Sequence, residues 1–126
     1  SLVLRQKTKS QYLLSKLASD RLEFFADGKI AFTYITKEDF LNLNANIGDH
    51  EGIVDIGRDI KGVEVSIFIR EDDGYRFALR SNGKVSVNEI ASLFGGGGHK
   101  MAAGGVLNTE FNDVKERLLV ETKKRV

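Results

Sequence analysis

Residues 62–81 read GVEVSIFIREDDGYRFALRS and carry the clearest structural pattern in the chain. Apolar side chains alternate with other side chains over 63–69 and again over 75–79, which is the two-residue period of a β-strand. Asp73 and Gly74 lie between the two runs and suit a tight turn, because glycine accepts a positive φ. The stretch therefore predicts two antiparallel strands joined as a hairpin.

The part of the chain before this hairpin predicts a helix and a second hairpin. Apolar residues at helical spacing indicate a helix over about 7–18. Two apolar runs follow, at 22–25 and 30–35, on either side of Asp27-Gly28, a dipeptide that favours a hairpin turn. We expect these runs to form paired strands.

Two short helices are expected between the hairpins. Thr36 followed by Asp39 is typical of a capped helix start, because each side chain can bond to the backbone N–H of the other residue. Asp49 is expected to cap a further helix, with Ile53 and Ile56 on its buried face.

The part after the central hairpin predicts a helix, a strand and a last helix. Ser86 and Glu89 are spaced as a capping box for a helix that ends at Gly95. A short strand is expected at 106–107, and an amphipathic helix from Phe111 onward. Strands and helices mixed in this way predict an α/β (α+β) fold with a mixed sheet of about five strands flanked by helices.

Composition narrows the class of protein further. The chain has 126 residues, 41% hydrophobic and 29% charged, which is typical of one globular domain over residues 1–126. No apolar run reaches the length of a membrane-spanning helix. It has no cysteine, which excludes thiol catalysis and fits the cytoplasm, where we expect the protein. A net charge of +1 argues against non-specific binding of long nucleic acids but leaves a small anionic ligand open.

Six of the 13 glycines lie within one short segment, at positions 95–98, 104 and 105. Ordering four consecutive glycines costs backbone entropy, so the run calls for a physical reason. One reason is an anionic ligand lying directly on backbone N–H groups. The spacing fits neither a Walker loop nor a Rossmann loop. Composition alone leaves a flexible turn and a phosphate cradle equally open.

The ordered string FGGGGHKMAAGG at 94–105 closely resembles the GGGH signature of the DHH-associated domain, type one. That domain forms the C-terminal half of DHH-family phosphoesterases. The resemblance extends to IKGVEVS at 60–66, ALRS at 78–81 and VSVNEIA at 85–91, with weaker similarity at 51–55. Within the family the chain looks most like the nanoRNase/pAp phosphatases, which are bifunctional oligoribonucleases.

The resemblance implies that this domain binds the substrate and that a second domain carries out the hydrolysis. Enzymes of this family hydrolyse short oligonucleotides, pAp or cyclic dinucleotides with two Mn²⁺ ions held by an N-terminal DHH domain. This chain has no Asp-His-His string, and the nearest match is Asp49-His50-Glu51. We therefore expect a substrate-binding domain with no cofactor of its own, which works with a DHH domain in cis and is inactive when isolated. Its expected ligand is a short oligonucleotide or a pAp-like nucleotide.

The resemblance also assigns roles to three polar residues. His99 takes the position of a histidine that faces the scissile phosphate, where its N–H can donate to developing charge. The alternative is a histidine that only holds the loop. Arg80 would contact a substrate phosphate or a terminal base through its guanidinium, unless it is simply solvated. Ser81 would either add a hydroxyl contact or cap the following turn.

The remaining candidate residues belong to the glycine run and to an upstream segment. Gly96, Gly97 and Gly98 would offer amide donors or allow a ligand to approach closely. Lys100 would add charge to the site or form an exposed ion pair. His50 and Glu51 match a region that approaches the nucleotide in this family.

Two other functions stay open from the sequence. The same domain occurs in cyclic di-AMP phosphodiesterases, and a related one occurs as an RNA-binding appendage at the C-terminus of alanyl-tRNA synthetases. The near-neutral charge and the Arg80-Ser81 pair argue against the appendage.

Overall fold

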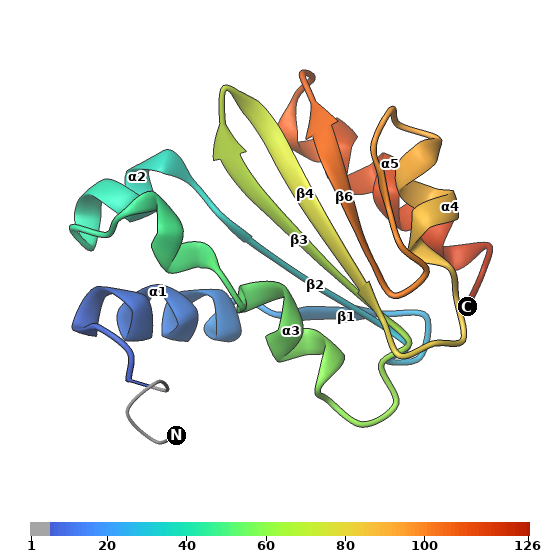
Figure 1. Cartoon of the computed structure of the whole chain (residues 1–126), viewed down its shortest axis with the longest axis horizontal. Helices are drawn as coiled ribbons and strands as arrows, with labels where there is room; N and C mark the ends of the chain where they lie inside the picture. The colour runs from blue at the N-terminus through green and yellow to red at the C-terminus, as the bar shows by residue number, and fades with distance from the viewer. Residues whose placement is uncertain (1–5) are drawn as a thin grey trace.

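A computed structural model describes residues 6–126 and contains an open mixed sheet of six strands, in the order β1-β2-β3-β4-β6-β5 (Figure 1). Neighbouring strands are antiparallel except β2 and β3, which are parallel. The strands are β1 (Glu23–Phe25), β2 (Ile30–Ile35), β3 (Val65–Asp72), β4 (Gly74–Ser81), β5 (Gly97–Gly98) and β6 (Ala102–Leu107). The helices are α1 (Lys9–Asp20), α2 (Lys37–Asn42), the 3₁₀ helix η2 (Ile47–His50), α3 (Ile53–Arg58), α4 (Val87–Ser92) and α5 (Phe111–Lys123).

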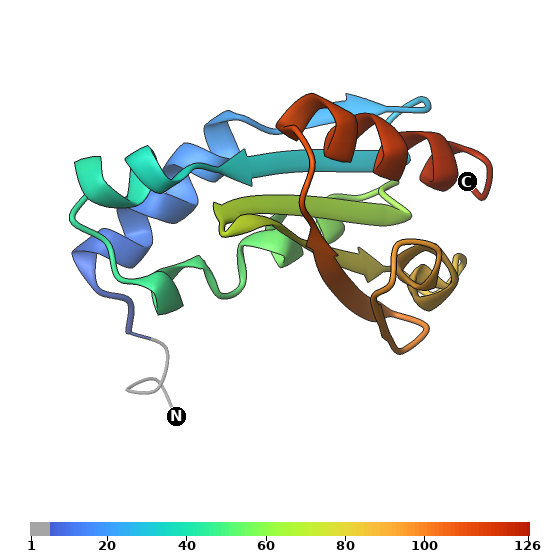
Figure 2. The ribbon, with the colours of Figure 1, turned by 90° about the horizontal axis from the view of Figure 1, so that it is seen from above.

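Helices cover both faces of the sheet, and each face has its own hydrophobic core (Figures 1 and 2). Alternate residues of β3 show the division, because Ile67 and Ile69 pack toward α4 and α5 while Phe68 packs toward α1 and α3. No helix within residues 6–126 is long and apolar enough to cross a bilayer. The predicted fold class is therefore confirmed, with one strand more than expected.

Both predicted hairpins are present. Residues of β1 pair with β2 around Asp27-Gly28, and β3 pairs with β4 around the turn at Asp73. The expected Thr36–Asp39 capping box opens α2. The helix expected over 7–18 begins two residues later, at Lys9.

Two capping predictions are wrong. Asp49 lies within η2 and does not cap α3, because its carboxylate accepts hydrogen bonds from the Ser10 hydroxyl and the Asn46 N–H instead. Helix α3 begins after Gly52, whose φ of 86° reverses the chain there. The buried face of α3 holds Ile53 as expected, but with Val54 and Gly57 rather than Ile56.

The second wrong cap is at α4. Ser86 is at the N-cap of α4, but its side chain makes no capping hydrogen bond. The helix also ends at Ser92, earlier than the expected limit at Gly95.

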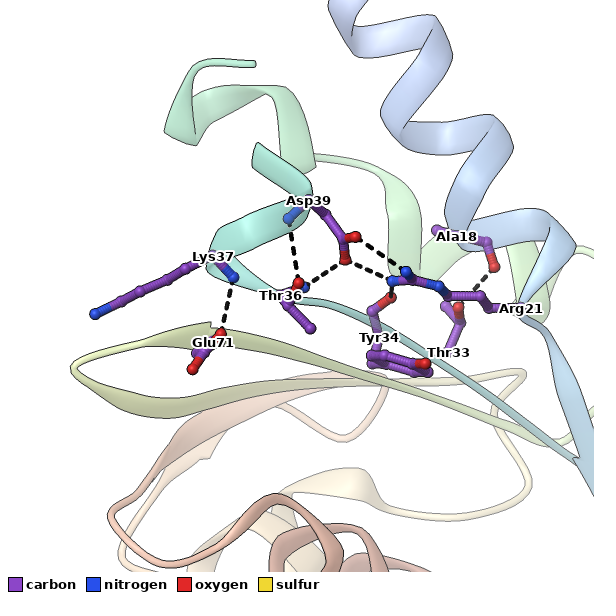
Figure 3. Close-up of polar contacts among 8 residues, drawn as sticks. All are labelled: Ala18, Arg21, Thr33, Tyr34, Thr36, Lys37, Asp39 and Glu71. Carbon is purple, nitrogen blue, oxygen red and sulfur yellow. Dashed lines mark hydrogen bonds and ion pairs between the residues drawn. The ribbon is translucent and has the colours of Figure 1, made fainter. Parts of the chain in front are cut away.

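One buried polar network joins three elements on the α1 side of the sheet (Figure 3). Arg21, at the end of α1, donates to both carboxylate oxygens of Asp39 at 2.5 and 3.0 Å and to the Tyr34 carbonyl at 3.2 Å. Burial acts to raise the pKa of Asp39, but hydrogen bonds from Arg21 and Thr36 hold that pKa below its ordinary value. The network therefore fixes α2 against α1 and β2.

Candidate functional site

A cleft of about 500 Å³ opens on the face of β3 and β4 that also carries α3. Its walls come from the segment between η2 and α3 and from the neighbouring strand β6. Its lining residues are His50, Glu51, Gly52, Val54, Phe68, Arg70, Arg76, Phe77, Ala78, Arg80, Gly105 and Val106. Three of these are arginines and one is acidic, so the lining is cationic.

The three arginines project from two paired strands. Arg70 of β3 lies directly opposite Arg76 of β4, and Arg80 lies further along β4 on the same face. Arg76 donates to Asp72 at 2.9 Å, while the Arg80 Nε lies 3.6 Å from an Asp55 carboxylate oxygen. The arginines are therefore only partly neutralised by neighbouring acids.

The interior of the cleft disfavours further positive charge. Burial lowers the pKa of Arg70, and the neighbouring Arg76 lowers it further against the opposing effect of Asp72. The His50 ring stacks on Phe68 with 6.2 Å between ring centroids. Burial, and then the charge of Arg70, lowers the pKa of His50. An anion in this cleft would relieve the repulsion.

The glycine-rich segment next to the cleft is a tight hairpin. Gly97–Gly98 forms β5 and pairs with β6, and the backbone groups of His99 and Ala102 close the turn at 2.7 and 3.3 Å. A Cβ on Gly98 would lie 2.5 Å from the Ala102 carbonyl oxygen, and one on Gly96 would collide with the Gly104 carbonyl. These two glycines therefore allow β5 and β6 to approach.

The amide groups of the run are partly used within the protein. The Gly96 N–H donates to the Ala91 carbonyl at 2.9 Å, and the Gly98 N–H donates to the Asn88 side chain at 3.0 Å. Gly97 is different, since a Cβ there would meet only the Asn88 side-chain oxygen, at 3.7 Å. Close approach of a ligand at Gly97 stays a prediction.

The structure brings some of the predicted site residues together and separates others. Arg80 and Glu51 line the cleft, and Gly105 brings the glycine motif to its edge. His99 and Lys100 are exposed in the turn and do not line the cleft. Arg80 pairs with Ala102, which bonds to His99, so the His99 backbone lies two strand spacings from Arg80, about 10 Å away.

Ser81 is turned away from solvent. Its side chain is fully buried, and its hydroxyl accepts a hydrogen bond from the Gly83 N–H at 3.0 Å. This is the turn-capping arrangement that the sequence left as an alternative to a ligand contact.

Sequence reasoning missed Arg70 and Arg76 as site residues. A signal was available, because a turn at Asp73-Gly74 places residues 70 and 76 opposite each other. Like charges directly opposite in a sheet are destabilising, so such a pair indicates a role outside folding.

Side chains grouped as in a metal centre are absent from the described residues. Within 6–126 no group of three or more His, Cys, Asp or Glu side chains is placed to hold a metal ion. We assign no manganese chemistry to the residues described.

Comparison with known proteins gives several matches. The bifunctional oligoribonuclease and PAP phosphatase NrnA of Thermus thermophilus is 35% identical over 80 residues, which cover 62% of this chain and 25% of that protein. An exopolyphosphatase-related protein from Bacteroides fragilis superposes with a TM-score of 0.86 and 32% identity, covering 94% of this chain and 36% of that one. The chain thus spans about a quarter to a third of the length of these relatives.

A more distant structure shares the fold. The pGpG-specific phosphodiesterase PggH of Vibrio cholerae superposes with a TM-score of 0.65 at 17% identity, over 92% of this chain and 39% of that one. The sequence model of the DHHA1 domain matches residues 27–125, which is most of the chain and includes the cleft and the glycine motif. The resemblance seen in the sequence is confirmed, and the chain belongs to the DHHA1 domain family of DHH phosphoesterases.

Proposed function

We propose that this chain is the substrate-binding part of a DHH-family phosphoesterase, and that it binds a short oligoribonucleotide or a pAp-like nucleotide. The observation that carries the proposal is the arginine-lined cleft on β3 and β4, bordered by Gly105 of the glycine motif. Guanidinium groups bind phosphate oxygens with two parallel hydrogen bonds, which suits a phosphorylated ligand. The Thermus relative is named as an oligoribonuclease and PAP phosphatase.

Catalysis would need a second domain. The chain spans 25% of the Thermus relative, and we infer that an N-terminal DHH domain in the same polypeptide supplies Mn²⁺ and the hydrolytic step. Arg80 would hold a substrate phosphate from the cleft wall. His99, exposed on the neighbouring turn, would donate to a phosphate oxygen once that domain closes over the cleft. The comparisons favour neither a cyclic di-AMP phosphodiesterase nor an RNA-binding appendage.

The binding proposal can be tested on this chain by NMR. Titration of the ¹⁵N-labelled chain with pAp and with the dinucleotide ApA should shift amide signals of residues 50–52, 76–80 and 104–106. Arg80→Ala should weaken binding because a charge-assisted contact is lost. Arg117→Ala, on the α5 face of the sheet, is the matched control and should leave binding unchanged. Shifts confined to α5, or no shifts at all, would contradict the proposal.

A further inference from the structure

The pair Arg70 and Arg76 is an unusual feature of the cleft. The two residues are direct cross-strand partners on the cleft face of β3 and β4. Both lie near one carboxylate oxygen of Asp72, which accepts from the Arg76 Nε at 2.9 Å but is 3.6 Å from the Arg70 Nη1. The single carboxylate of Asp72 therefore lies near two guanidinium groups, and only that of Arg76 makes a hydrogen bond to it.

Arg70 is left with an unused donor. Its side chain is 15% exposed, and its Nη1 atom is the one buried side-chain nitrogen or oxygen without a hydrogen-bond partner in the described part of the chain. Buried polar atoms in proteins nearly always find a partner, so an orphan of this kind needs an explanation. An acceptor that enters the cleft would supply the missing bond.

The arginine pair is separate from Arg80. Arg76 and Arg80 are four residues apart on β4, which places their Cα atoms about 13 Å apart along the strand. The Arg80 guanidinium also lies against Asp55, whereas that of Arg76 bonds to Asp72, so a phosphate at Arg80 in this arrangement leaves the space between Arg70 and Arg76 open. The cleft has room for two anionic groups of one ligand, since its volume is about 500 Å³.

We propose that Arg70 and Arg76 form a second phosphate subsite, which binds a terminal phosphate monoester of the ligand. The proposal rests on the proposed nucleotide-binding function. A monoester carries more than one negative charge near pH 7 and offers three acceptor oxygens, whereas an internal diester carries a single charge. Two adjacent guanidinium groups therefore fit the monoester better than the diester.

The test compares three ligands on the 126-residue chain by NMR titration: ApA, pApA and ApAp. All three have the same internal diester, and the last two add a terminal phosphate at one end or the other. The chain should bind at least one of the two phosphorylated ligands about tenfold or more tightly than ApA. Arg70→Gln and Arg76→Gln should each remove that preference, because they weaken the phosphorylated ligand about tenfold more than they weaken ApA. Arg80→Ala should weaken all three ligands.

The controls separate this proposal from the proposed function. Arg117→Gln removes an arginine outside the cleft and should retain the preference. Arg76 is half exposed, so Arg76→Gln gives a folded variant even if Arg70→Gln does not. The subsite is overturned, while nucleotide binding stands, if the unsubstituted chain binds ApA, pApA and ApAp with equal affinity. The same holds if Arg76→Gln still binds a phosphorylated ligand more tightly than ApA. Equal weakening of all three ligands by Arg76→Gln also overturns it, and failure of all three to bind overturns both proposals.

Discussion

Gly97 differs physically from the glycines on either side of it. A Cβ on Gly97 meets only the Asn88 side chain, whereas one on Gly96 collides with the Gly104 carbonyl. We expect Gly97→Ala to change the free energy of unfolding by less than about 0.5 kcal/mol, because nothing must move. Gly96→Ala should lower it by about 1–3 kcal/mol, because the backbone of β6 must shift. Urea denaturation of both variants measures the difference, and equal losses would contradict this account.

The same residue tests contact between ligand and glycine motif. Gly97→Val should weaken binding of a short oligonucleotide while the chain stays folded, because added bulk blocks the ligand before it disturbs the core. Amide spectra report the fold, and titration with pAp reports the binding. If affinity is unchanged in a folded Gly97→Val variant, the motif acts only as a structural turn.

Arg80 and His99 should affect turnover in different ways in the full-length protein. Arg80→Ala should raise KM more than it lowers kcat, since a phosphate contact made equally in ground and transition states is lost. Arg80→Lys should not restore KM fully, because an ammonium lacks the planar fork. His99→Ala should lower kcat by roughly 10²–10³, the usual loss for one donor to developing charge. Steady-state kinetics on a dinucleotide measures both, and an unchanged kcat in His99→Ala would contradict the role given to His99.

The sequence could identify individual site residues only where they belong to a pattern. His99 and Arg80 became candidates through a recognisable string, and of these two only Arg80 lines the cleft. Arg70 did not become a candidate, because its burial beside Arg76 is visible only in the fold. The role of Ser81 could not be chosen from the sequence. A hydroxyl next to a strand end serves a ligand or a turn equally well, and only the fold shows that it faces inward.

At the scale of elements, α2 depends on the network around Asp39. We expect Asp39→Asn to lower the free energy of unfolding by about 1–3 kcal/mol, since the partly buried Arg21 guanidinium loses a charged partner. Asp20→Asn removes an exposed pair with Lys16 and should change it by no more than about 0.5 kcal/mol. Thermal or urea unfolding of both variants gives the comparison. If both substitutions lower the free energy of unfolding by similar amounts, the network around Asp39 stabilises the chain no more than an exposed ion pair does.

The pH dependence of this network has a definite sign. The pKa of Asp39 is lower in the folded chain than in the unfolded chain. Its contribution to stability is therefore present above the ordinary pKa of 3.8 and is lost as the pH falls below that value. The Asp39→Asn variant should lose less stability than the unsubstituted chain between pH 5 and pH 2.

Elements with side-chain periodicity were predictable, and those built on glycine were not. The β3–β4 hairpin and the amphipathic helix α5 follow from their apolar spacing. Strand β5 consists of two glycines, so it has no apolar pattern. In β6 the end at 106–107 was predicted from its apolar residues, but the part that runs through Gly104 and Gly105 was not. A Cβ on Gly105 would lie 2.8 Å from the Phe77 ring, a contact that depends on the neighbouring strand and not on local sequence.

At the scale of the whole molecule, protonation of His50 in the cleft makes the free energy of unfolding depend on pH. Its pKa is lowered by burial and by Arg70, so the unfolded chain binds its proton more tightly. The free energy of unfolding should therefore decrease as the pH falls below the ordinary pKa of 6.5. His50→Gln should reduce this dependence between pH 7 and pH 5. A bound phosphate ligand should raise the His50 pKa, which NMR titration of the ring protons measures.

The isolated chain should not hydrolyse its ligand. The described residues offer no group of side chains suited to a metal ion, and hydrolysis assisted by a metal needs one to activate water. Incubation of the 126-residue chain with Mn²⁺ and a labelled dinucleotide should give no product above the buffer control. Turnover that disappears when carboxylates of this chain are replaced would show that catalysis resides here.

The single parallel pairing in the sheet has a consequence for how the chain folds. The β1–β2 and β3–β4 hairpins join neighbouring segments, but Ile30 of β2 meets Val65 of β3 only after α2, η2 and α3 have crossed between them. Closing such a long connection costs more entropy than closing a hairpin, so we expect it to come late. One wall of the cleft comes from this connection, and the face on which the cleft opens belongs to the β3–β4 hairpin. The cleft therefore forms only when β2 pairs with β3. A ligand bound across the cleft should slow the separation of these two strands and so lengthen the lifetime of the folded chain.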